Sequence, residues 1–388
     1  MRKFIAVCCM LFVVMLGVTG LTVFPVYAEE DKNVYDVKSA YLMDYDSKTV
    51  LFEQNATEQL PVASMVKLMT ILLTFEEIDA GRLNFNDDVL TSENASSMGG
   101  SQVFIDPYVN YKVEDLLKSV IVASANDASV ALAEKIAGSE EEFVKRMNKR
   151  AKELGMNNTN YVNCTGLPAP MQYSCAKDIA TLDSYVIAHK EYFKYSTIWM
   201  EDLVHPSGRI TGLVNTNKLI RYFKGCDCGK TGSTSEAGYC LTASAKRGNM
   251  RLIATVIGAK DSKSRFNETS KLLNFGFNNF ENKQLVAAGT IITDIPVKKS
   301  ETTSVNLLAS EDFYVVSKKG DQGAYEMSYE VPEQLIAPFK AGEQIGKLII
   351  TKNGQVIKEM PLISGENVEK LTFGQALHDV LESWSFWG

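Results

Sequence analysis

Three short motifs in this chain carry the residue types that acyl transfer needs. Ser64 is followed by Lys67, Ser124 by Asn126, and Lys230 opens the sequence Lys-Thr-Gly. A serine hydroxyl is a weak nucleophile, so it needs a base close by, and a second hydroxyl can relay protons. A lysine ammonium can hold an anionic substrate as a point charge. The set therefore predicts a serine nucleophile that attacks an anionic acyl compound.

Each motif taken singly is weak, because chains of this length contain such patterns by chance. A second Ser-x-x-Lys occurs at Ser174, and Ser-x-Asn recurs at Ser92 and Ser304, whereas Lys-Thr-Gly occurs once. Ser174 has no Ser-x-Asn followed by Lys-Thr-Gly downstream. We therefore interpret Ser174 as structural and expect Ser64, with the motifs that follow it, to form one site.

The segment from Ser64 to about Glu77 is almost entirely apolar or threonine. Such a pattern predicts a helix buried on all sides, with Ser64 at its N-terminus. Lys67 lies three residues on and shares the face of Ser64. Ser64 could be a simple helix N-cap, but that reading leaves a lysine inside an apolar helix unexplained.

The second and third motifs fall where elements meet. Helical periodicity covers 113–122 and 128–136, so Ser124 and Asn126 lie in the turn between two helices. Alternating or β-branched segments predict strands at 40–44, 49–53, 230–231, 238–244 and 250–257, and residues 265–280 read as a helix. Strands at both ends with helices between predict an α+β fold, a sheet with a helical cluster on one side.

Residues 35–282 resemble the D-alanyl-D-alanine carboxypeptidases, the low-molecular-mass, serine-type penicillin-binding proteins. The resemblance rests on four segments: Pro61 to Thr70, Ala123 to Ala128, Asn163 to Leu167 and Lys230 to Tyr239. Three features depart from the family pattern: Ser233 and Gln172 stand where histidine is frequent, and the segment from Cys226 to Gly229 is unusual. The resemblance implies a β-lactamase/transpeptidase-like domain and no cofactor or metal.

The resemblance also implies the catalytic roles. Ser64 would attack the carbonyl of the penultimate D-alanine, form an acyl-enzyme and release the terminal D-alanine. Lys67 would take the serine proton if burial and the nearby Lys230 keep it neutral. Ser124 would relay the proton to the leaving amine.

The remaining site residues are expected to bind substrate. Asn126 would hydrogen-bond the peptide, while Lys230 and Thr231 would hold the terminal carboxylate. Arg251 is a candidate second carboxylate contact, although a structural strand arginine fits it equally well. Gly232 would permit close backbone approach, and the Ser233 and Ser64 amides would form the oxyanion hole.

The N-terminus, residues 1–28, reads as a signal peptide. Arg2 and Lys3 precede an apolar run that ends near Val26-Tyr27-Ala28, a small-residue cleavage site. An uncleaved anchor is the alternative. The predicted location is therefore outside the cell, at the outer face of the cytoplasmic membrane. The net charge is −7 and becomes more negative if Arg2 and Lys3 are removed, which argues against a nucleic-acid partner.

Five of the seven cysteines remain after the signal peptide, at positions 164, 175, 226, 228 and 240. Their spacing and the scattered histidines do not fit a zinc site. We interpret them as small apolar fillers, with one disulfide possible.

Two further segments follow the predicted catalytic domain. Residues 283–364 contain short alternating runs and an Asn353-Gly354 turn, which predict a small all-β domain. By resemblance it spaces the catalytic unit from the membrane, although a ligand-binding role is open. Residues 366–388 place Phe373, Leu377 and Trp384 at helical spacing, so we expect an amphipathic helix that anchors to a membrane surface or docks on the β-domain.

The sequence is compatible with three functions. The first is a carboxypeptidase acting on peptidoglycan stem peptides ending in D-Ala-D-Ala, limiting their cross-linking and inhibited by β-lactams. The second is a β-lactamase, but the deacylating Glu-x-x-Leu-Asn loop of that class is absent between Asn126 and Lys230. The third is a catalytically idle penicillin-binding scaffold, against which the complete set of motif residues argues.

Overall fold

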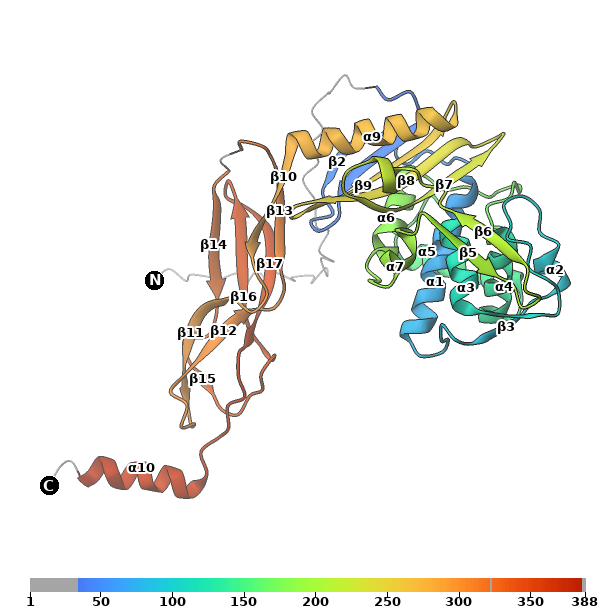
Figure 1. Cartoon of the computed structure of the whole chain (residues 1–388). Coiled ribbons are helices and arrows are strands. Elements are labelled where there is room, and N and C mark those ends of the chain that lie inside the picture. The colour runs from blue at the N-terminus through green and yellow to red at the C-terminus, as the bar shows by residue number, and fades with distance from the viewer. Residues whose placement is uncertain (1–33, 322, 386–388) are drawn as a thin grey trace, which may run out of the picture.

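The structure, a computed structural model, describes residues 34–321 and 323–385. The predicted signal peptide and the last three residues of the predicted C-terminal helix, 386–388, lie outside these residues. The described chain forms an N-terminal unit of mixed helices and strands and an elongated, all-β C-terminal unit, with a single helix beyond it (Figure 1). The α+β fold predicted from the sequence is confirmed.

A five-stranded antiparallel sheet forms the centre of the N-terminal unit, in the order β2-β1-β9-β8-β7. Its strands come from both ends of this unit: β1 (Ser39–Asp44), β2 (Val50–Gln54), β7 (Cys226–Thr234), β8 (Gly238–Arg247) and β9 (Met250–Ala259). The Lys-Thr-Gly motif lies on β7, one of the two edge strands.

Both faces of this sheet are covered, and the side chains of β9 show why. Leu252, Ala254 and Val256 point to one face, where they pack with residues of α9 (Ser262–Asn279). Ile253 and Ile257 alternate to the other face and join the core of the helical cluster. The period of two therefore places β9 between two apolar layers.

The helical cluster contains the predicted central helix and its neighbours. Its helical elements are η1 (Ala63–Val66), α1 (Lys67–Asp79), α2 (Glu93–Ser96), α3 (Val113–Val122), α4 (Asn126–Ala137), α5 (Glu140–Glu153), α6 (Ala176–Val186), α7 (Tyr192–Ser196) and α8 (Leu219–Tyr222). Two small hairpins complete it: β3 (Asp88–Leu90) with β4 (Asn110–Lys112), and β5 (Met200–Val204) with β6 (Ile210–Val214).

The C-terminal unit follows α9 without a linker, because β10 begins at the next residue. Its strands are β10 (Phe280–Val286), β11 (Ile291–Lys298), β12 (Ser304–Ala309), β13 (Phe313–Lys318), β14 (Tyr325–Glu330), β15 (Leu335–Ile336), β16 (Gln344–Lys352) and β17 (Gln355–Ser364). The unit has its own apolar core. Asn353 and Gly354 both have positive φ in the β16–β17 turn, as the Asn-Gly pair predicts.

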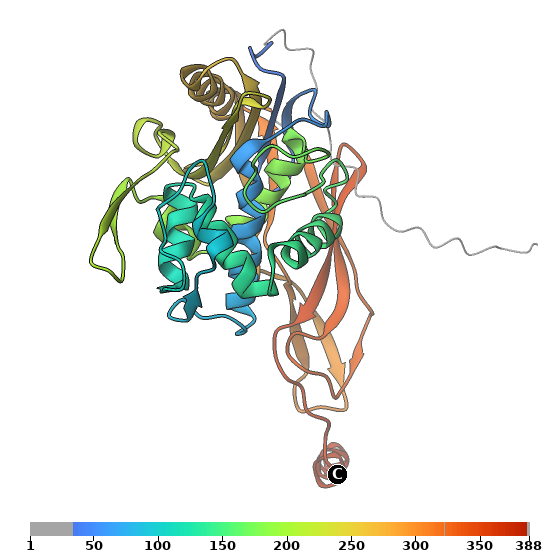
Figure 2. The same cartoon turned by 90° about the vertical axis from the view of Figure 1, so that its right-hand side faces the viewer.

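The C-terminal unit extends away from the N-terminal unit and carries α10 (Phe373–Ser385) at its far end (Figures 1 and 2). Large apolar side chains on α10 are exposed, among them Phe373 at 85% and Leu381 at 57%. Among the helices of the described residues, none combines the length and apolarity needed to cross a membrane.

Candidate active site

Ser64 lies in a 3₁₀ turn, and the α-helix proper starts only at Lys67, so the helix predicted from Ser64 begins later than expected. The turn is held in an unusual shape, with a φ of 48° at Ala63. Two glycines confine it. A Cβ atom at Gly166 would lie 2.1 Å from the Ala63 carbonyl oxygen, and one at Gly232 would lie 3.2 Å from the Ser64 amide nitrogen. The backbone of Ser64 is therefore packed between two segments distant in sequence.

Lys67 places its amine beside this serine. Its Nζ lies 3.1 Å from Ser64 Oγ and donates to the Thr165 carbonyl. The side chain is fully buried, and burial lowers the pKa of Lys67 to about 7. A large fraction of Lys67 is therefore neutral near pH 7 and has a lone pair available for the serine proton.

The other two motifs meet each other through a hydrogen bond between their side chains. Lys230 Nζ donates to Ser124 Oγ at 2.6 Å and to the Thr231 carbonyl at 3.2 Å. Ser124 has a φ of 61° in the turn between α3 and α4, which aims its side chain at β7 rather than along a helix. Burial, together with the charges of Lys67 and Arg265, lowers the pKa of Lys230.

Asn126 is the first residue of α4 and is buried. Its Nδ2 donates to the Gly99 carbonyl at 2.6 Å, while its Oδ1 has no partner among the described residues. The adjacent Asp127 fixes this arrangement, because its carboxylate accepts from the backbone amides of Val103 and Ile105. The role of Asp127 was not predicted from the sequence, although an acidic residue stands directly after the Ser-x-Asn motif.

The residue that follows the Lys-Thr-Gly motif on β7 is exposed to solvent. Thr231 and Gly232 are buried, whereas Ser233 is exposed. Gly232 lies against Val62 and Ser64, so the Ser64 and Ser233 amides come from segments in contact. The predicted residues Ser64, Lys67, Ser124, Asn126, Lys230, Thr231, Gly232 and Ser233 thus lie on adjoining elements: η1, α1, the α3–α4 turn, α4 and β7.

The structure favours the structural interpretation of Arg251, which the sequence left open beside a carboxylate contact. Its guanidinium makes a bidentate pair with Asp227 at 2.8 and 2.7 Å, and Nη1 also donates to Ser244. Both terminal nitrogens of Arg251 are therefore engaged with Asp227 or Ser244, and neither bonds to a motif residue. Arg265 approaches the strand instead: its Nη1 donates to the Gly232 carbonyl at 3.1 Å.

Arg265 has an unusual environment for a structural residue. It is 9% exposed, and its Nε has no partner among the described residues. Burial lowers its pKa from the ordinary arginine value. The only feature of the sequence that could have pointed to Arg265 was its position at the start of the predicted helix 265–280.

The second Ser-x-x-Lys behaves as expected of a structural residue. Ser174 is fully buried, its hydroxyl bonds to Thr159, and its backbone pairs with Leu60. The five cysteines outside the signal region are all free and buried, so they form no disulfide among the described residues.

Comparisons with known proteins agree with this architecture. A family model described as D-alanyl-D-alanine carboxypeptidase matches residues 27–261, and one described as penicillin-binding protein 5, C-terminal domain, matches residues 280–370. The chain is 39% identical to D-alanyl-D-alanine carboxypeptidase DacF of Bacillus subtilis, over 97% of this chain and 98% of that protein. It is 37% identical to DacC of Escherichia coli, over 86% of this chain and 85% of that protein.

A solved structure is similar over the same extent. Penicillin-binding protein 5 from Haemophilus influenzae superposes with a TM-score of 0.73 at 34% identity, covering 87% of this chain and 98% of that one. Since the first family model spans more than half of the chain and the Bacillus relative aligns almost end to end, the chain belongs to the D-alanyl-D-alanine carboxypeptidase family.

Proposed function

We propose that this serine-type D-alanyl-D-alanine carboxypeptidase removes the terminal D-alanine from peptidoglycan stem peptides through an acyl-enzyme on Ser64. The observation that carries the proposal is the pairing of two buried lysines with two serines. Lys67 Nζ is 3.1 Å from Ser64 Oγ, and Lys230 Nζ is 2.6 Å from Ser124 Oγ.

In the first step, neutral Lys67 takes the Ser64 proton while Oγ attacks the carbonyl of the penultimate D-alanine. The Ser64 and Ser233 amides receive the developing oxyanion. The amide C–N bond then breaks, and the leaving nitrogen takes a proton relayed through Ser124. Water hydrolyses the resulting ester and restores the Ser64 hydroxyl.

The terminal carboxylate is held by Lys230 and Thr231. A bound carboxylate favours the charged form of Lys230, because an opposite charge raises an amine's pKa and so opposes the lowering caused by burial. Arg265, whose Nη1 donates to the Gly232 carbonyl, would supply the second positive charge near the carboxylate, the role first considered for Arg251. Asn126 presents its unpartnered Oδ1 to a substrate N–H.

Two observations favour a carboxypeptidase over a β-lactamase. The carboxylate that acts electrostatically on Lys67 is Asp127. Its oxygens already accept from the backbone of Val103 and Ile105, so it is not free to activate a water. A penicillin acyl-enzyme should therefore persist, which makes β-lactams inhibitors rather than substrates.

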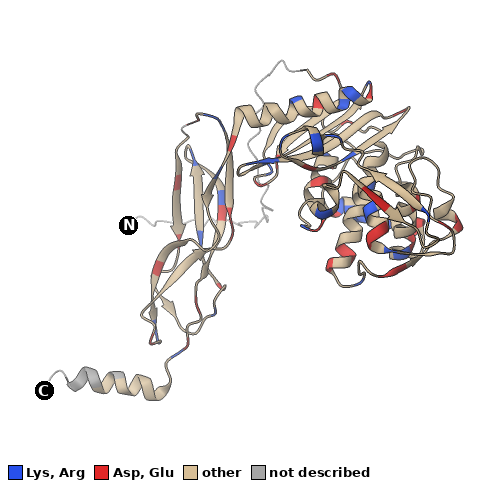
Figure 3. Cartoon of the chain, in the orientation of Figure 1, with Lys and Arg blue, Asp and Glu red and all other residues tan. Residues whose placement is uncertain are grey.

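The finer location is also part of the proposal. Low-molecular-mass penicillin-binding proteins act on peptidoglycan in the cell envelope, and residues 1–28 would direct export across the cytoplasmic membrane. The exposed apolar residues Phe373, Leu377 and Leu381 of α10 support attachment to a membrane surface rather than docking on the β-unit. The sequence of α10 contains Asp379 and Glu382 but no Lys or Arg (Figure 3), so attachment would rest on apolar contact and would gain nothing from anionic lipids.

The test is D-alanine release from a pentapeptide ending in D-Ala-D-Ala, for the wild type and Ser64→Ala. The proposal expects release by the wild type and none by the variant, with the melting temperature preserved because Ser64 is only half-buried. Ser174→Ala serves as the matched control from the second Ser-x-x-Lys and should retain release. Release that survives Ser64→Ala would remove Ser64 from its role.

A further inference from the structure

The side-chain amide of Asn126 is oriented by the loop of residues 99–105. Its Nδ2 donates to the Gly99 carbonyl at 2.6 Å, and the backbone amide of Asn126 donates to the Ser101 carbonyl at 2.7 Å. With Nδ2 held in this way, Oδ1 is the amide atom left for a substrate N–H, and it has no partner among the described residues. The position of the 99–105 loop therefore determines where the substrate-binding oxygen of Asn126 lies.

This loop contains an unfavourable backbone conformation at Phe104. Its φ is 61°, in the left-handed region that bulky residues rarely adopt. The Phe104 side chain is 56% exposed, so its own burial does not hold the loop in this shape. Such conformations persist only where the surrounding structure fixes them. On one side that support is Asp127, whose carboxylate accepts from the Val103 and Ile105 amides.

The turn of the β5–β6 hairpin supports the other side of the loop. Arg209 lies in this turn, where its carbonyl accepts from the His205 amide at 2.8 Å. Its Nη2 donates to the Phe104 carbonyl and lies 3.3 Å from Asp106 Oδ1. Arg209 therefore bonds directly to the residue with the unfavourable backbone and to the acid two residues further on.

A chain of hydrogen bonds through His205 adds a second link from the hairpin to the loop. Arg209 Nη2 lies 3.1 Å from His205 Nδ1, and His205 Nε2 lies 2.8 Å from Thr211 Oγ1. Because a guanidinium has only donors, Nδ1 accepts, and Nε2 carries the ring proton and donates to Thr211. The Thr211 hydroxyl donates in turn to the Val103 carbonyl at 3.3 Å. His205 is 2% exposed, so water does not compete for its ring nitrogens.

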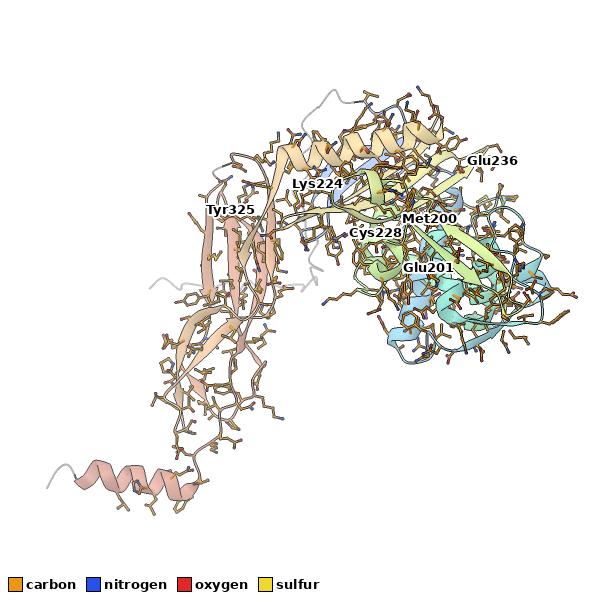
Figure 4. The ribbon with its side chains drawn as sticks, in the orientation of Figure 1. Met200, Glu201, Lys224, Cys228, Glu236 and Tyr325 are labelled. Atoms are coloured by element: carbon orange, nitrogen blue, oxygen red, sulfur yellow. The ribbon has the colours of Figure 1, made fainter. Side chains whose placement is uncertain are left out.

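The hairpin is itself anchored on the helical cluster. Leu203 of β5 and Leu213 of β6 are buried in the core of that cluster. Glu201 of β5 pairs with Lys118 of α3 (Figure 4). The hairpin can therefore serve as a fixed support for the loop.

We propose that Arg209 is a positioning residue for substrate binding: with His205 and Thr211, it holds the 99–105 loop in the shape that orients Asn126. The side-chain hydrogen bonds of these three residues run to one another and to residues 103–111, and none reaches a motif residue within the described chain. Their effect on the reaction therefore passes through the loop. This inference rests on the proposed function, because it uses the substrate contact that the proposed function gives to Asn126.

Arg209→Ala should weaken the hydrogen bond between substrate and Asn126 without removing a group that touches substrate. Loss of one neutral hydrogen bond corresponds to about a fivefold fall in kcat/KM. The fall should appear as a higher KM, because a binding contact is lost, whereas a smaller folded fraction would lower kcat and leave KM unchanged.

The experiment is a double-mutant cycle on D-alanine release from a synthetic peptide ending in D-Ala-D-Ala. It compares the wild type, Arg209→Ala, Asn126→Ala and the double variant, with melting temperatures measured on the same samples. Arg209→Ala should lower kcat/KM about fivefold in the wild-type chain. In the Asn126→Ala chain, where the contact that Arg209 supports is absent, the same change should lower kcat/KM by less than about twofold.

A second variant and a control accompany the cycle. Thr211→Val removes the donor to the Val103 carbonyl at nearly unchanged volume and should show the same dependence on Asn126. Arg82→Ala, at an exposed arginine that pairs with Glu77 near the end of α1, is the matched control and should keep the wild-type kcat/KM.

Equal fold losses in both backgrounds, an unchanged kcat/KM in Arg209→Ala and Thr211→Val, or a fall in kcat at constant KM with a lower melting temperature would overturn this inference while leaving the carboxypeptidase reaction in place. If Arg209→Ala does not fold, Thr211→Val in the two backgrounds decides between these outcomes. Failure of the wild type to release D-alanine would overturn the proposed function, and this inference with it.

Discussion

The contact between Gly232 and the turn that carries Ser64 gives a prediction whose size follows from the structure. An alanine Cβ at position 232 would lie 2.5 Å from the Val62 carbonyl oxygen and 3.2 Å from the Ser64 amide nitrogen. Ordinary carbon-to-oxygen contacts are about 3.3 Å or longer, so Val62 and the strand must separate by about 0.8 Å. The backbone of Gly232 is not in the left-handed region, so the effect comes from this contact alone.

The shift acts on the nucleophile and on one side of the oxyanion hole. Misplacement of reacting groups by about 1 Å can cost about 100-fold in rate, so Gly232→Ala should slow acylation of Ser64 by roughly that factor. The overpacking itself should destabilise the fold by about 1–3 kcal/mol. The rate loss should therefore exceed the modest fall in melting temperature.

The assay is the rate of acylation by a chromogenic β-lactam, followed by rapid mixing, with the melting temperature measured on the same samples. Gly212→Ala is the matched control, because it also lies in a strand and its new Cβ would meet no atom closer than Asp202 Oδ1 at 3.8 Å. Acylation of Gly232→Ala within about twofold of wild type would refute the argument that this close contact positions Ser64.

Three further predictions follow from buried charged groups. Because Lys67 must be neutral to accept a proton and its pKa is about 7, the acylation rate should rise as pH increases through 7 and level off above it, which a pH–rate profile will show. Asp127→Asn should replace an acceptor for the 99–105 loop by a donor, costing about 1–3 kcal/mol in urea unfolding and lowering kcat/KM. Burial raises the pKa of Asp183 to about 7, above its unfolded value, so stability should fall as pH rises from about 4 to 7. Asp183→Asn, which keeps an acceptor for Thr242, should weaken that fall; an unchanged pH dependence of unfolding would contradict it.

Much of this fold could be predicted from local sequence patterns. The alternation in 250–257 and the helical periodicity of 113–122 correspond to β9 and α3, because both elements bury residues at their characteristic periods. The Asn353-Gly354 pair predicted its turn for a local reason, since both residues tolerate positive φ. Features set within one element were therefore visible in the sequence.

Features set by contacts between segments distant in sequence could not be predicted from the sequence. The helix could not be seen to start at Lys67, because the 3₁₀ turn before it packs against Gly166 and Gly232, which are remote in sequence. The choice between Arg251 and Arg265 also depended on the tertiary structure. Asp227 engages the first, and the start of α9 brings the second to the Lys-Thr-Gly strand.

The most direct test of the central claim is the intact mass of the protein over time after mixing with benzylpenicillin, with the modified residue located by peptide mapping. The account predicts one lasting adduct on Ser64 and none after Ser64→Ala. An adduct on another serine, or rapid loss of the adduct with destruction of the drug, would contradict it.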